Sequence, residues 1–316
     1  MMYLVLVAAF FLLIKVYFKL AAHYNIIDKP NERSSHTSIT IRGGGVVFVM
    51  AALIALILDF YGFGIPAAGV IIIGVISFLD DIYSLPNKVR ILFHIAAVSL
   101  MFFYLAVFGN FPVYVIVAFY ILVIGIINAY NFMDGINGIT GLYSLVTLGA
   151  LQFVNIQQVH FINKDMIWLP MLACAVFLFF NFRKKAACFA GDVGSVTIAF
   201  WIITLLLKLI LVTGEWKYLL LLSVYGVDTI LTIIHRLILK QNIFKAHRLH
   251  FYQLLANERK MPHLLVASLY AVVQAAIDVF IISNQNSLQM NIAIVGIPLV
   301  LIYVILKPGL KPKLAV

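Results

Sequence analysis

The stretch INAYNFMDGINGITG, residues 127–141, places three Asn, one Asp and three Gly between two long apolar runs. Polar groups are costly in hydrocarbon unless they find partners or face water. The stretch therefore predicts that one membrane helix ends here and that the next one begins. It also predicts that the polar chemistry of this chain gathers at connections between helices.

The composition of the whole chain predicts that lipid surrounds it. Of 316 residues, 64% are hydrophobic and 11% are charged, whereas a soluble domain carries about 25% charged residues. The mean hydropathy is +1.08, and so apolar a chain cannot bury its surface within itself. Cys174 and Cys188 provide no disulfide framework and are expected to be buried thiols. The net charge of +10 is expected to reflect the sidedness of membrane loops, with no nucleic acid as partner.

A spanning helix needs about 20 apolar residues, and eleven segments approach this requirement. The first lacks a basic start and a cleavage site of small residues, so we interpret it as a retained helix and not as a signal peptide. Gly64 and Pro66 are expected to form the turn between the second and third segments. We predict an all-α, polytopic membrane protein of about 10–11 helices, formed by residues 2–20, 44–63, 65–79, 91–109, 112–127, 136–157, 166–181, 194–213, 216–234, 263–283 and 290–307.

Lys and Arg indicate the orientation. Seventeen of the 22 fall in loops after odd-numbered segments or in the C-terminal tail, two fall on the opposite side, and three lie within segments. This bias predicts an N-terminus outside and a C-terminus in the cytoplasm. Most acids share the basic side, and no loop is long enough for a soluble domain. We therefore predict one transmembrane catalytic domain, residues 1–316, with its active site on the cytoplasmic segments 21–43, 80–90, 128–135, 182–193 and 235–262.

The pair Asp80 and Asp81 in ISFLDDIYSLPNKVR, residues 76–90, lies at the predicted end of the third helix. Two carboxylates there face the negative end of the helix dipole and each other, which costs free energy unless a cation neutralises them. Lys88, Arg90 or a bound metal could do so, and Mg²⁺ usually takes one or two protein carboxylates plus substrate phosphates. The alternative is an ordinary surface pair.

Residues 129–141 are interpreted as a helix start with Asp134 as N-cap. Gly135, Gly138 and Gly141 recur every three residues and predict a stripe of small residues on that helix. The stripe favours close helix packing, whereas free N–H groups at a helix start favour a phosphate. The polar neighbours favour a ligand site: Asn128, Asn131 and Asn137.

Three more segments on the same side are rich in polar groups. FAGDVGSVTIAF, residues 189–200, repeats the layout, with Asp192 or Ser195 as the expected cap and Phe189 expected in the core or stacked on a nucleobase. The loop 27–45 carries Arg42 before three glycines, and its donors would suit phosphate as well as an ordinary connection. Residues 235–260 are basic but lack the Cys ligands of a zinc site, so their Arg and His are expected to face phosphate or anionic lipid.

An acidic cluster, phosphate-type helix starts and a basic loop on one membrane face predict phosphoryl transfer, in which catalysis is mostly positioning and charge neutralisation. A substrate with a lipid tail would explain why no soluble domain is needed. The alternative is a polytopic transporter with a cytoplasmic acidic cluster, although transporters place ionisable groups near the bilayer midplane. A phosphotransferase of the CDP-alcohol type would need D-G-x-x-A-R, which DGINGITG does not match at Ala-Arg.

The motifs DKPNERSSH…RGGG, LDD, NFMDGINGITG, GDVGS and AHRLHFYQ occur in this order between residues 27 and about 255. With them the chain resembles the polyprenyl-phosphate N-acetylhexosamine-1-phosphate transferases (glycosyltransferase family 4). The last motif is closer to the undecaprenyl-phosphate GlcNAc-1-phosphate transferases of the O-antigen and capsule branch than to the peptidoglycan translocase. This resemblance implies that a UDP-sugar gives its sugar-1-phosphate to undecaprenyl (polyprenyl) phosphate, with release of UMP and initiation of a lipid-linked envelope polysaccharide such as that of lipopolysaccharide.

The resemblance also implies Mg²⁺, for which Mn²⁺ could substitute, and a multi-pass location in the bacterial inner membrane. Its implied catalytic residues are Asp80, Asp81, Asp134 and Asp192, with the metal ligands Asp192, Asp80 and Asp81. The implied nucleotide-binding residues are Asn131, Asp134, Asn137, Asn181 and Phe189. The implied phosphate-binding residues are Lys29, His36, Arg42, Lys88, His247, Arg248 and His250.

One position departs from the family pattern. Asn137 stands where the family commonly has Asp, in DGIDG, and Asn keeps a hydrogen-bonding carbonyl but loses the charge. It is therefore not expected to be a base or a metal ligand. GlcNAc is the default sugar of the UDP-N-acetyl donor, and GalNAc, FucNAc and QuiNAc are alternatives. In-line attack is favoured over a covalent aspartyl-phosphate. The sequence does not decide whether the chain forms a homodimer.

Overall fold

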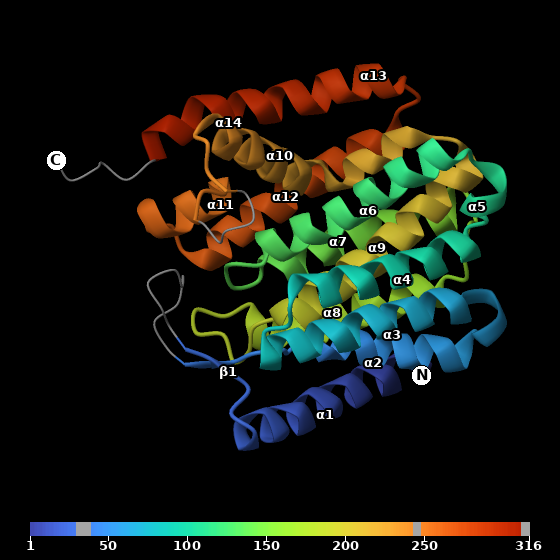
Figure 1. The fold of residues 1–316 in the computed structure, drawn as a ribbon, viewed down its shortest axis with the longest axis vertical. Helices are drawn as coiled ribbons and strands as arrows, with labels where there is room; N and C mark the ends of the chain where they lie inside the picture. The colour runs from blue at the N-terminus through green and yellow to red at the C-terminus, as the bar shows by residue number, and fades with distance from the viewer. Residues whose placement is uncertain (30–38, 243–247, 311–316) are drawn as a thin grey trace.

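The computed structural model describes residues 1–29, 39–242 and 248–310. Over these residues the chain forms one bundle of helices that run side by side (Figure 1). Two short strands, β1 (Ile27–Asp28) and β2 (Thr40–Ile41), pair antiparallel beside the end of the first helix. The helical elements are α1 (Met2–His23), α2 (Val46–Leu58), α3 (Phe60–Tyr83), α4 (Asn87–Tyr104), α5 (Val107–Asn110), α6 (Val113–Met133), α7 (Ile139–Gln157), α8 (Asp165–Asn181), α9 (Gly191–Thr213), η1 (Trp216–Leu222), α10 (Ser223–Ile238), α11 (Phe251–Gln253), η2 (Leu254–Glu258), α12 (His263–Ser283), α13 (Leu288–Asn291), η3 (Ile292–Gly296) and α14 (Ile297–Leu310).

The prediction of an all-α polytopic membrane protein is confirmed. Within the described residues, nine helices are long and apolar enough to cross a membrane, with η1–α10 and α13–α14 each acting as one span. Two shorter apolar helices, α2 and α8, complete the eleven predicted segments. The orientation of the bundle, with the N-terminus outside, stays a prediction.

The predicted turn between the second and third segments is wrong. The chain turns at Asp59, whose carboxylate accepts the N–H of Gly62 at 2.9 Å and caps α3. Gly64 and Pro66 lie inside α3, where Pro66 removes one intrahelical hydrogen bond near the helix start. A local cap at Asp59 therefore sets this boundary, and the Gly and Pro do not.

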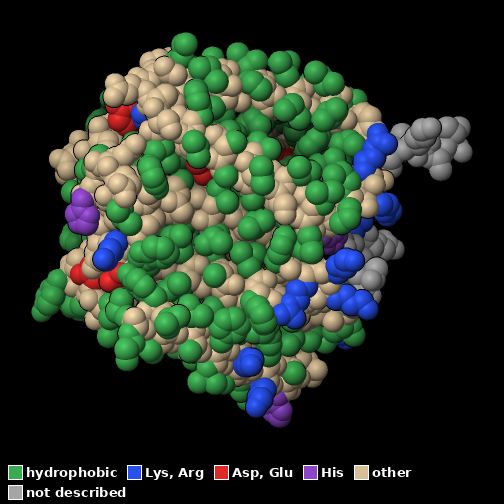
Figure 2. All heavy atoms as spheres, turned by 180° about the vertical axis from the view of Figure 1, so that it is seen from behind, with side chains coloured by type: hydrophobic (Ala, Val, Ile, Leu, Met, Phe, Trp, Pro, Cys, Tyr) green, Lys and Arg blue, Asp and Glu red, His purple; other side chains and the backbone are tan. Residues whose placement is uncertain are grey.

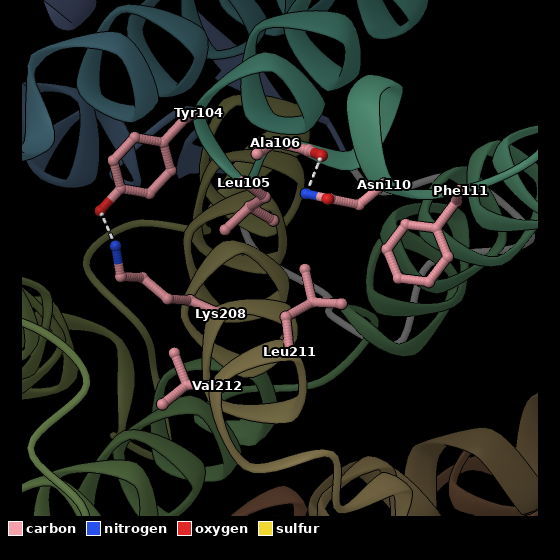
Figure 3. A pocket seen from close by; sticks show the side chains of 8 residues that line it. All are labelled: Tyr104, Leu105, Ala106, Asn110, Phe111, Lys208, Leu211 and Val212. Atoms are coloured by element: carbon pink, nitrogen blue, oxygen red, sulfur yellow. Dashed lines mark hydrogen bonds between the residues drawn. The ribbon is translucent and has the colours of Figure 1, made fainter.

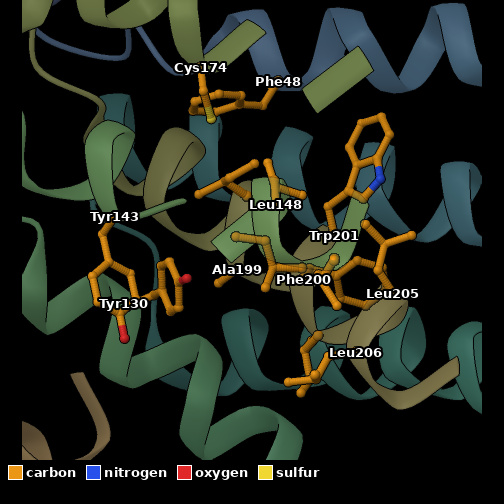
Figure 4. Close-up of a cluster of buried hydrophobic side chains, with 14 of the residues drawn as sticks. Phe48, Tyr130, Tyr143, Leu148, Cys174, Ala199, Phe200, Trp201, Leu205 and Leu206 are labelled. Carbon is orange, nitrogen blue, oxygen red and sulfur yellow. The ribbon is translucent and has the colours of Figure 1, made fainter. Parts of the chain in front are cut away.

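Helix α9 forms the centre of the bundle. Its side chains are buried almost continuously from Val193 to Ile210, and α2, α3, α6 and α7 pack around it. Figure 4 shows part of this core, in which Phe200 and Trp201 of α9 lie near Leu148. Because lipid tails are as apolar as these side chains, close packing holds the core together. Because α9 lies at the centre of the bundle, packing fixes the positions of its first residue, Gly191, and of Asp192.

The outer helices expose apolar side chains, as lipid contact requires. Leu12 of α1, Ile121 of α6 and Ile305 of α14 are all exposed. Figure 2 shows a face that is mostly hydrophobic, with Lys and Arg gathered towards one end of the bundle. This distribution agrees with a membrane-embedded belt and one basic end.

Candidate active site

Four predicted site segments meet at one end of the bundle. They are the loop through Arg42, the end of α3 with Asp80 and Asp81, the end of α6 with Asn131, and the start of α9 with Asp192. The strand β1 and the short helix α11 lie at the same end (Figure 1). Hydrogen bonds and ion pairs between these segments bring their polar side chains together.

Asp81 clamps three of these segments. Its Oδ1 accepts the N–H of Asp192 and its Oδ2 accepts the N–H of Val193, each at 3.0 Å. Arg42 Nε lies 2.8 Å from Asp81 Oδ1, and the Asp81 side chain is 0% exposed. The predicted cap of α9 by Asp192 or Ser195 is therefore wrong. Asp81 caps that helix from α3, and an anion there would compete with it for these two N–H groups.

Two glycines of the motifs permit this approach. Gly191 has φ +72°, and a Cβ there would lie 2.5 Å from Asp81 Oδ2. A Cβ on Gly45 would lie 2.0 Å from the Cα of Gly194. The N–H of Gly44 donates to Phe189 O at 2.8 Å and that of Gly45 to Ala190 O at 3.0 Å. The RGGG and GDVGS motifs therefore pack backbone against backbone beside the carboxylates.

Asp80 has different partners from its neighbour. Its Oδ1 accepts the N–H of Leu85 at 2.6 Å, and its Oδ2 pairs with Arg90 Nη1 at 3.0 Å. Lys88, the other predicted cation, is exposed. Arg90 and Arg42 therefore neutralise the acidic pair, one guanidinium for each carboxylate.

Asp192 lies at the centre of the cluster. Its Oδ1 accepts a hydrogen bond from Asn131 Nδ2 at 3.0 Å and lies 3.8 Å from Arg42 Nη2. Its side chain keeps 23% exposure, so water or a ligand can reach it. Burial works against the charge of Arg42, but the carboxylates of Asp81, Asp192 and Asp28 prevail and raise its pKa above the ordinary value. Arg42 thus stays a permanent cation at the rim of the site.

The stretch 127–141 connects the end of one membrane helix to the start of the next, as predicted, but its local details differ from the prediction. Helix α6 ends at Met133, Asp134 follows as its C-cap residue, and α7 starts only at Ile139. The prediction of Asp134 as N-cap of α7 is therefore wrong, and so is the Gly stripe, because only Gly141 lies in α7. Loss of hydration, with Asp192 and Asp81 nearby, raises the pKa of Asp134 to about 7.

Two of the predicted nucleotide-binding residues connect separate backbone segments through side-chain hydrogen bonds. Asn137 Nδ2 donates to Arg183 O at 2.8 Å, and Asn181 Nδ2 donates to Cys188 O at 2.8 Å. Asn181 Oδ1 accepts the N–H of Gly138 at 2.6 Å. Both side chains are buried. These bonds tie the loop before α9 to the start of α7, while a nucleotide contact of either residue stays a prediction.

The predicted phosphate-binding residues spread more widely. Lys29 is exposed beyond β1, and Arg248 is half-buried, as is Phe189, which was predicted to bind the nucleotide. His250 is 2% exposed, and its Nδ1 lies 3.4 Å from Asp228 Oδ1. His36 and His247 lie outside the described residues. The structure therefore joins Arg42 directly to Asp81 and Asp192 and pairs His250 with a different, buried acid, Asp228.

Sequence reasoning missed two supports of this site. Asp228 accepts the N–H of Phe251 at 2.8 Å and the hydroxyl of Tyr270 at 2.8 Å. Tyr252 Oη donates to Phe132 O at 2.9 Å, which joins the segment of AHRLHFYQ to the end of α6. The available signal was an acid inside a predicted span, because such acids are usually paired and functional.

A separate pocket of about 360 Å³ lies elsewhere in the molecule. Figure 3 shows its lining, in which Lys208 donates to the hydroxyl of Tyr104 at 2.6 Å. Lys208 follows Asp192 by sixteen residues along α9, a rise of about 24 Å. None of the predicted site residues lines this pocket, so it is not the candidate active site.

The carboxylates suit a hard divalent cation, although no three-ligand set is preassembled. Among the described residues, no group of three or more His, Cys, Asp or Glu is arranged to hold a metal. Asp81 already pairs with Arg42 and accepts hydrogen bonds from two N–H groups. Asp80 and Asp192, however, lie close enough for their side chains to interact. Mg²⁺ needs only one or two protein carboxylates when phosphates supply other oxygens, so the pair fits it.

The fold and the site together define a polytopic membrane protein with an acidic and basic cluster at one end of its bundle. The model of the family described as glycosyl transferase family 4 matches residues 63–210 of the chain. This finding confirms the predicted resemblance and the predicted class of transferase.

Three relatives illustrate the similarity. The chain is 25% identical over 264 residues to the probable undecaprenyl-phosphate N-acetylglucosaminyl 1-phosphate transferase of Bacillus subtilis, covering 74% of this chain and 70% of that protein. It is 29% identical over 213 residues to the decaprenyl-phosphate N-acetylglucosaminephosphotransferase of Mycobacterium tuberculosis, covering 57% and 52%. It is 28% identical over 219 residues to the phospho-N-acetylmuramoyl-pentapeptide-transferase of Streptococcus thermophilus, covering 59% and 63%. The chain thus spans between about half and 70% of the length of these relatives.

Proposed function

We propose that the protein transfers an N-acetylhexosamine-1-phosphate from a UDP-sugar to undecaprenyl phosphate, or another polyprenyl phosphate, and releases UMP. The observation that carries this proposal is the meeting of Asp81 and Asp192 with Arg42, next to the Asp80–Arg90 pair, at one end of a membrane bundle. The names of the relatives support the reaction class, and two of them support GlcNAc as the sugar. The proposed role is initiation of a lipid-linked envelope polysaccharide at the inner membrane of a bacterium.

In this reaction an oxygen of the polyprenyl phosphate attacks the phosphorus that carries the sugar. The bond from this phosphorus to the bridging oxygen of the diphosphate breaks, and UMP leaves with that oxygen. A phosphate monoester has a second pKa of about 6, so the attacking group is mostly dianionic near neutral pH. A strong general base is therefore less important than neutralising charge and aligning the two phosphates.

The residues of the cluster divide this work. Arg42, at the rim, would face a substrate phosphate, and Asn131 keeps Asp192 in place through the bond from its amide. Asp80 and Asp192 would hold Mg²⁺, which would supply positive charge to the diphosphate. Among the described residues, the ion pairs of Asp80, Asp81 and Asp192 are with Arg42 and Arg90, so these three carboxylates outnumber the two guanidinium groups that pair with them. That excess suits a cation.

The test is release of UMP by the purified full-length protein in detergent. Undecaprenyl phosphate, UDP-GlcNAc and Mg²⁺ are supplied together and then omitted one at a time, and Mn²⁺ replaces Mg²⁺ in a further reaction. We expect UMP only when lipid, nucleotide sugar and metal are all present. UDP-linked GalNAc, FucNAc and QuiNAc then identify the preferred sugar. Uptake of a solute into proteoliposomes without any release of UMP would instead support the transporter and overturn the proposal.

A further inference from the structure

Asp228, in the middle of α10, is a buried acid to which the proposed reaction assigns no step. It is 3% exposed, and an isolated carboxylate so far from water would be strongly destabilising. Its Oδ1 accepts the N–H of Phe251 at 2.8 Å and the hydroxyl of Thr232 at 3.2 Å. Its Oδ2 accepts the N–H of Tyr252 at 3.3 Å and the hydroxyl of Tyr270 at 2.8 Å. The carboxylate is therefore surrounded by donors.

The donors come mainly from the segment that carries His250. The N–H groups of Phe251 and Tyr252 belong to the first turn of α11, directly after His250, whose Nδ1 faces Asp228 at 3.4 Å. Tyr252 in turn donates to Phe132 O at the end of α6, two residues before Asp134. Asp228 thus fixes the backbone between His250 and Tyr252 against one wall of the candidate site.

A cation from the last helix completes the arrangement. Lys307 Nζ donates to the hydroxyl of Tyr303 and to Thr232 Oγ1, the latter at 3.3 Å. The hydroxyls of Tyr303 and Thr232 are 2.7 Å apart, and Thr232 donates to Asp228. Hydrogen bonds therefore run without a break from an ammonium group to the carboxylate. Lys307, Tyr303, Thr232 and Asp228 are each more than nine-tenths buried.

Helix α14 packs against the rest of the bundle largely through this chain of groups. Its buried side chains are Tyr303, Lys307 and Leu310, which are spaced four and three apart and therefore share one face. Its other face is apolar and exposed, with Ile305 at 69%. An ammonium group buried on an otherwise lipid-facing helix needs a specific partner, and Asp228 is the carboxylate that the chain reaches.

We infer that Asp228 and Lys307 are a positioning pair, through which the C-terminal helix holds His250 and the N–H groups of Phe251 and Tyr252 in place beside the active site. The inference rests on the proposed function for the identity of that site. In this arrangement Lys307 acts through Asp228, and both are positioning residues.

The test combines amide hydrogen exchange with release of UMP, in the full-length protein. Lys307→Met removes the cation, Tyr303→Phe removes the bridging hydroxyl but keeps the direct Lys307–Thr232 hydrogen bond, and Ile305→Met on the exposed face is the matched control. We expect Lys307→Met to speed exchange at residues 251 and 252 about tenfold and to lower turnover by a similar factor, the effect of losing one hydrogen bond in a charged network. Peptides from α7 and α9 should keep their protection, which a general loss of stability would remove.

A double-mutant cycle makes the inference refutable. If Lys307 acts through Asp228, the substitution Lys307→Met should add nothing to Asp228→Asn. Additive effects, or unchanged exchange at residues 251 and 252 in both Lys307→Met and Tyr303→Phe, would overturn it. If the wild-type protein releases no UMP but the variants show the expected changes in exchange, the proposed reaction is refuted and the positioning pair is still supported.

Discussion

Asp81→Asn is the substitution that best tests the architecture of the site. It preserves the shape of the side chain and removes its charge. In the family motif LDD, Asp81 is implied to be a catalytic residue and a metal ligand, whereas its contacts here are those of a clamp between α3 and α9. We therefore expect the substitution to destabilise the fold at this junction as well as to reduce turnover.

The size of the effect follows from the partners. Hydrogen bonds to a charged group contribute about 1.5–3 kcal/mol each, and Asp81 accepts two, from the N–H groups of Asp192 and Val193. An Asn can accept one of them and turns its NH₂ towards the other donor, which leaves a buried N–H unpaired at a cost of about 1–3 kcal/mol. Arg42 is 37% exposed, so loss of the ion pair adds at most about 1 kcal/mol. We expect a total of about 3 kcal/mol.

The assay is thermal unfolding in detergent, with Glu215→Gln as an exposed control between α9 and η1. One kcal/mol corresponds to roughly 2–4 °C for a domain of 150–250 residues, so Asp81→Asn should lower the midpoint by about 6–12 °C. Asp80→Asn should lower it less, because Asp80 accepts a single backbone N–H whereas Asp81 accepts two. A midpoint within about one degree of wild type for Asp81→Asn would refute the clamp.

Three further predictions concern neighbouring residues. Asp192→Ala should reduce UMP release at least as much as Asp80→Ala, and near-normal turnover in Asp192→Ala would exclude it as a metal ligand. Gly45→Ala should prevent α2 from docking on α9, because the new Cβ would lie 2.0 Å from Gly194 Cα, whereas Gly149→Ala, with no atom within 4 Å, should preserve the thermal midpoint. Asn137→Asp, which restores the residue common in the family, should lower both the midpoint and turnover, because a buried carboxylate would face the carbonyls of Arg183 and Lys184 where the amide now donates. An active, stable Asn137→Asp protein would show that this loop rearranges.

The membrane spans could be predicted from the sequence because they depend on length and composition alone. A helix in lipid must satisfy its own backbone, so an apolar run such as 263–283 predicts the helix that is found there, His263–Ser283. The boundaries were less predictable. Gly64 and Pro66 looked like a turn, yet one side-chain bond at Asp59 sets the helix start instead.

The sequence predicted which residues form the site better than it predicted the contacts between them. The motifs named Arg42, Asp81 and Asp192, which do meet. The cap of α9 could not be predicted, because the residue that provides it lies 111 positions earlier in the chain. Capping rules describe local partners, and a partner from another helix has no signal in the local sequence. The same holds for Asp228, whose donors lie 23 and 24 positions later.

The adjacency of Asp80 and Asp81 is itself informative about their roles. Successive residues on an α-helix point about 100° apart, so two neighbouring carboxylates point in different directions. One can turn inward to another helix while the other turns towards the connecting loop, and this is what α3 shows: Asp81 meets the start of α9, and Asp80 meets Leu85 and Arg90. A motif of two adjacent acids at a helix end therefore predicts a division between structure and chemistry. In this chain Asp81 holds the backbone of Asp192 in place, and Asp80, which contacts Leu85 and Arg90, is the acid that we propose shares a cation with Asp192.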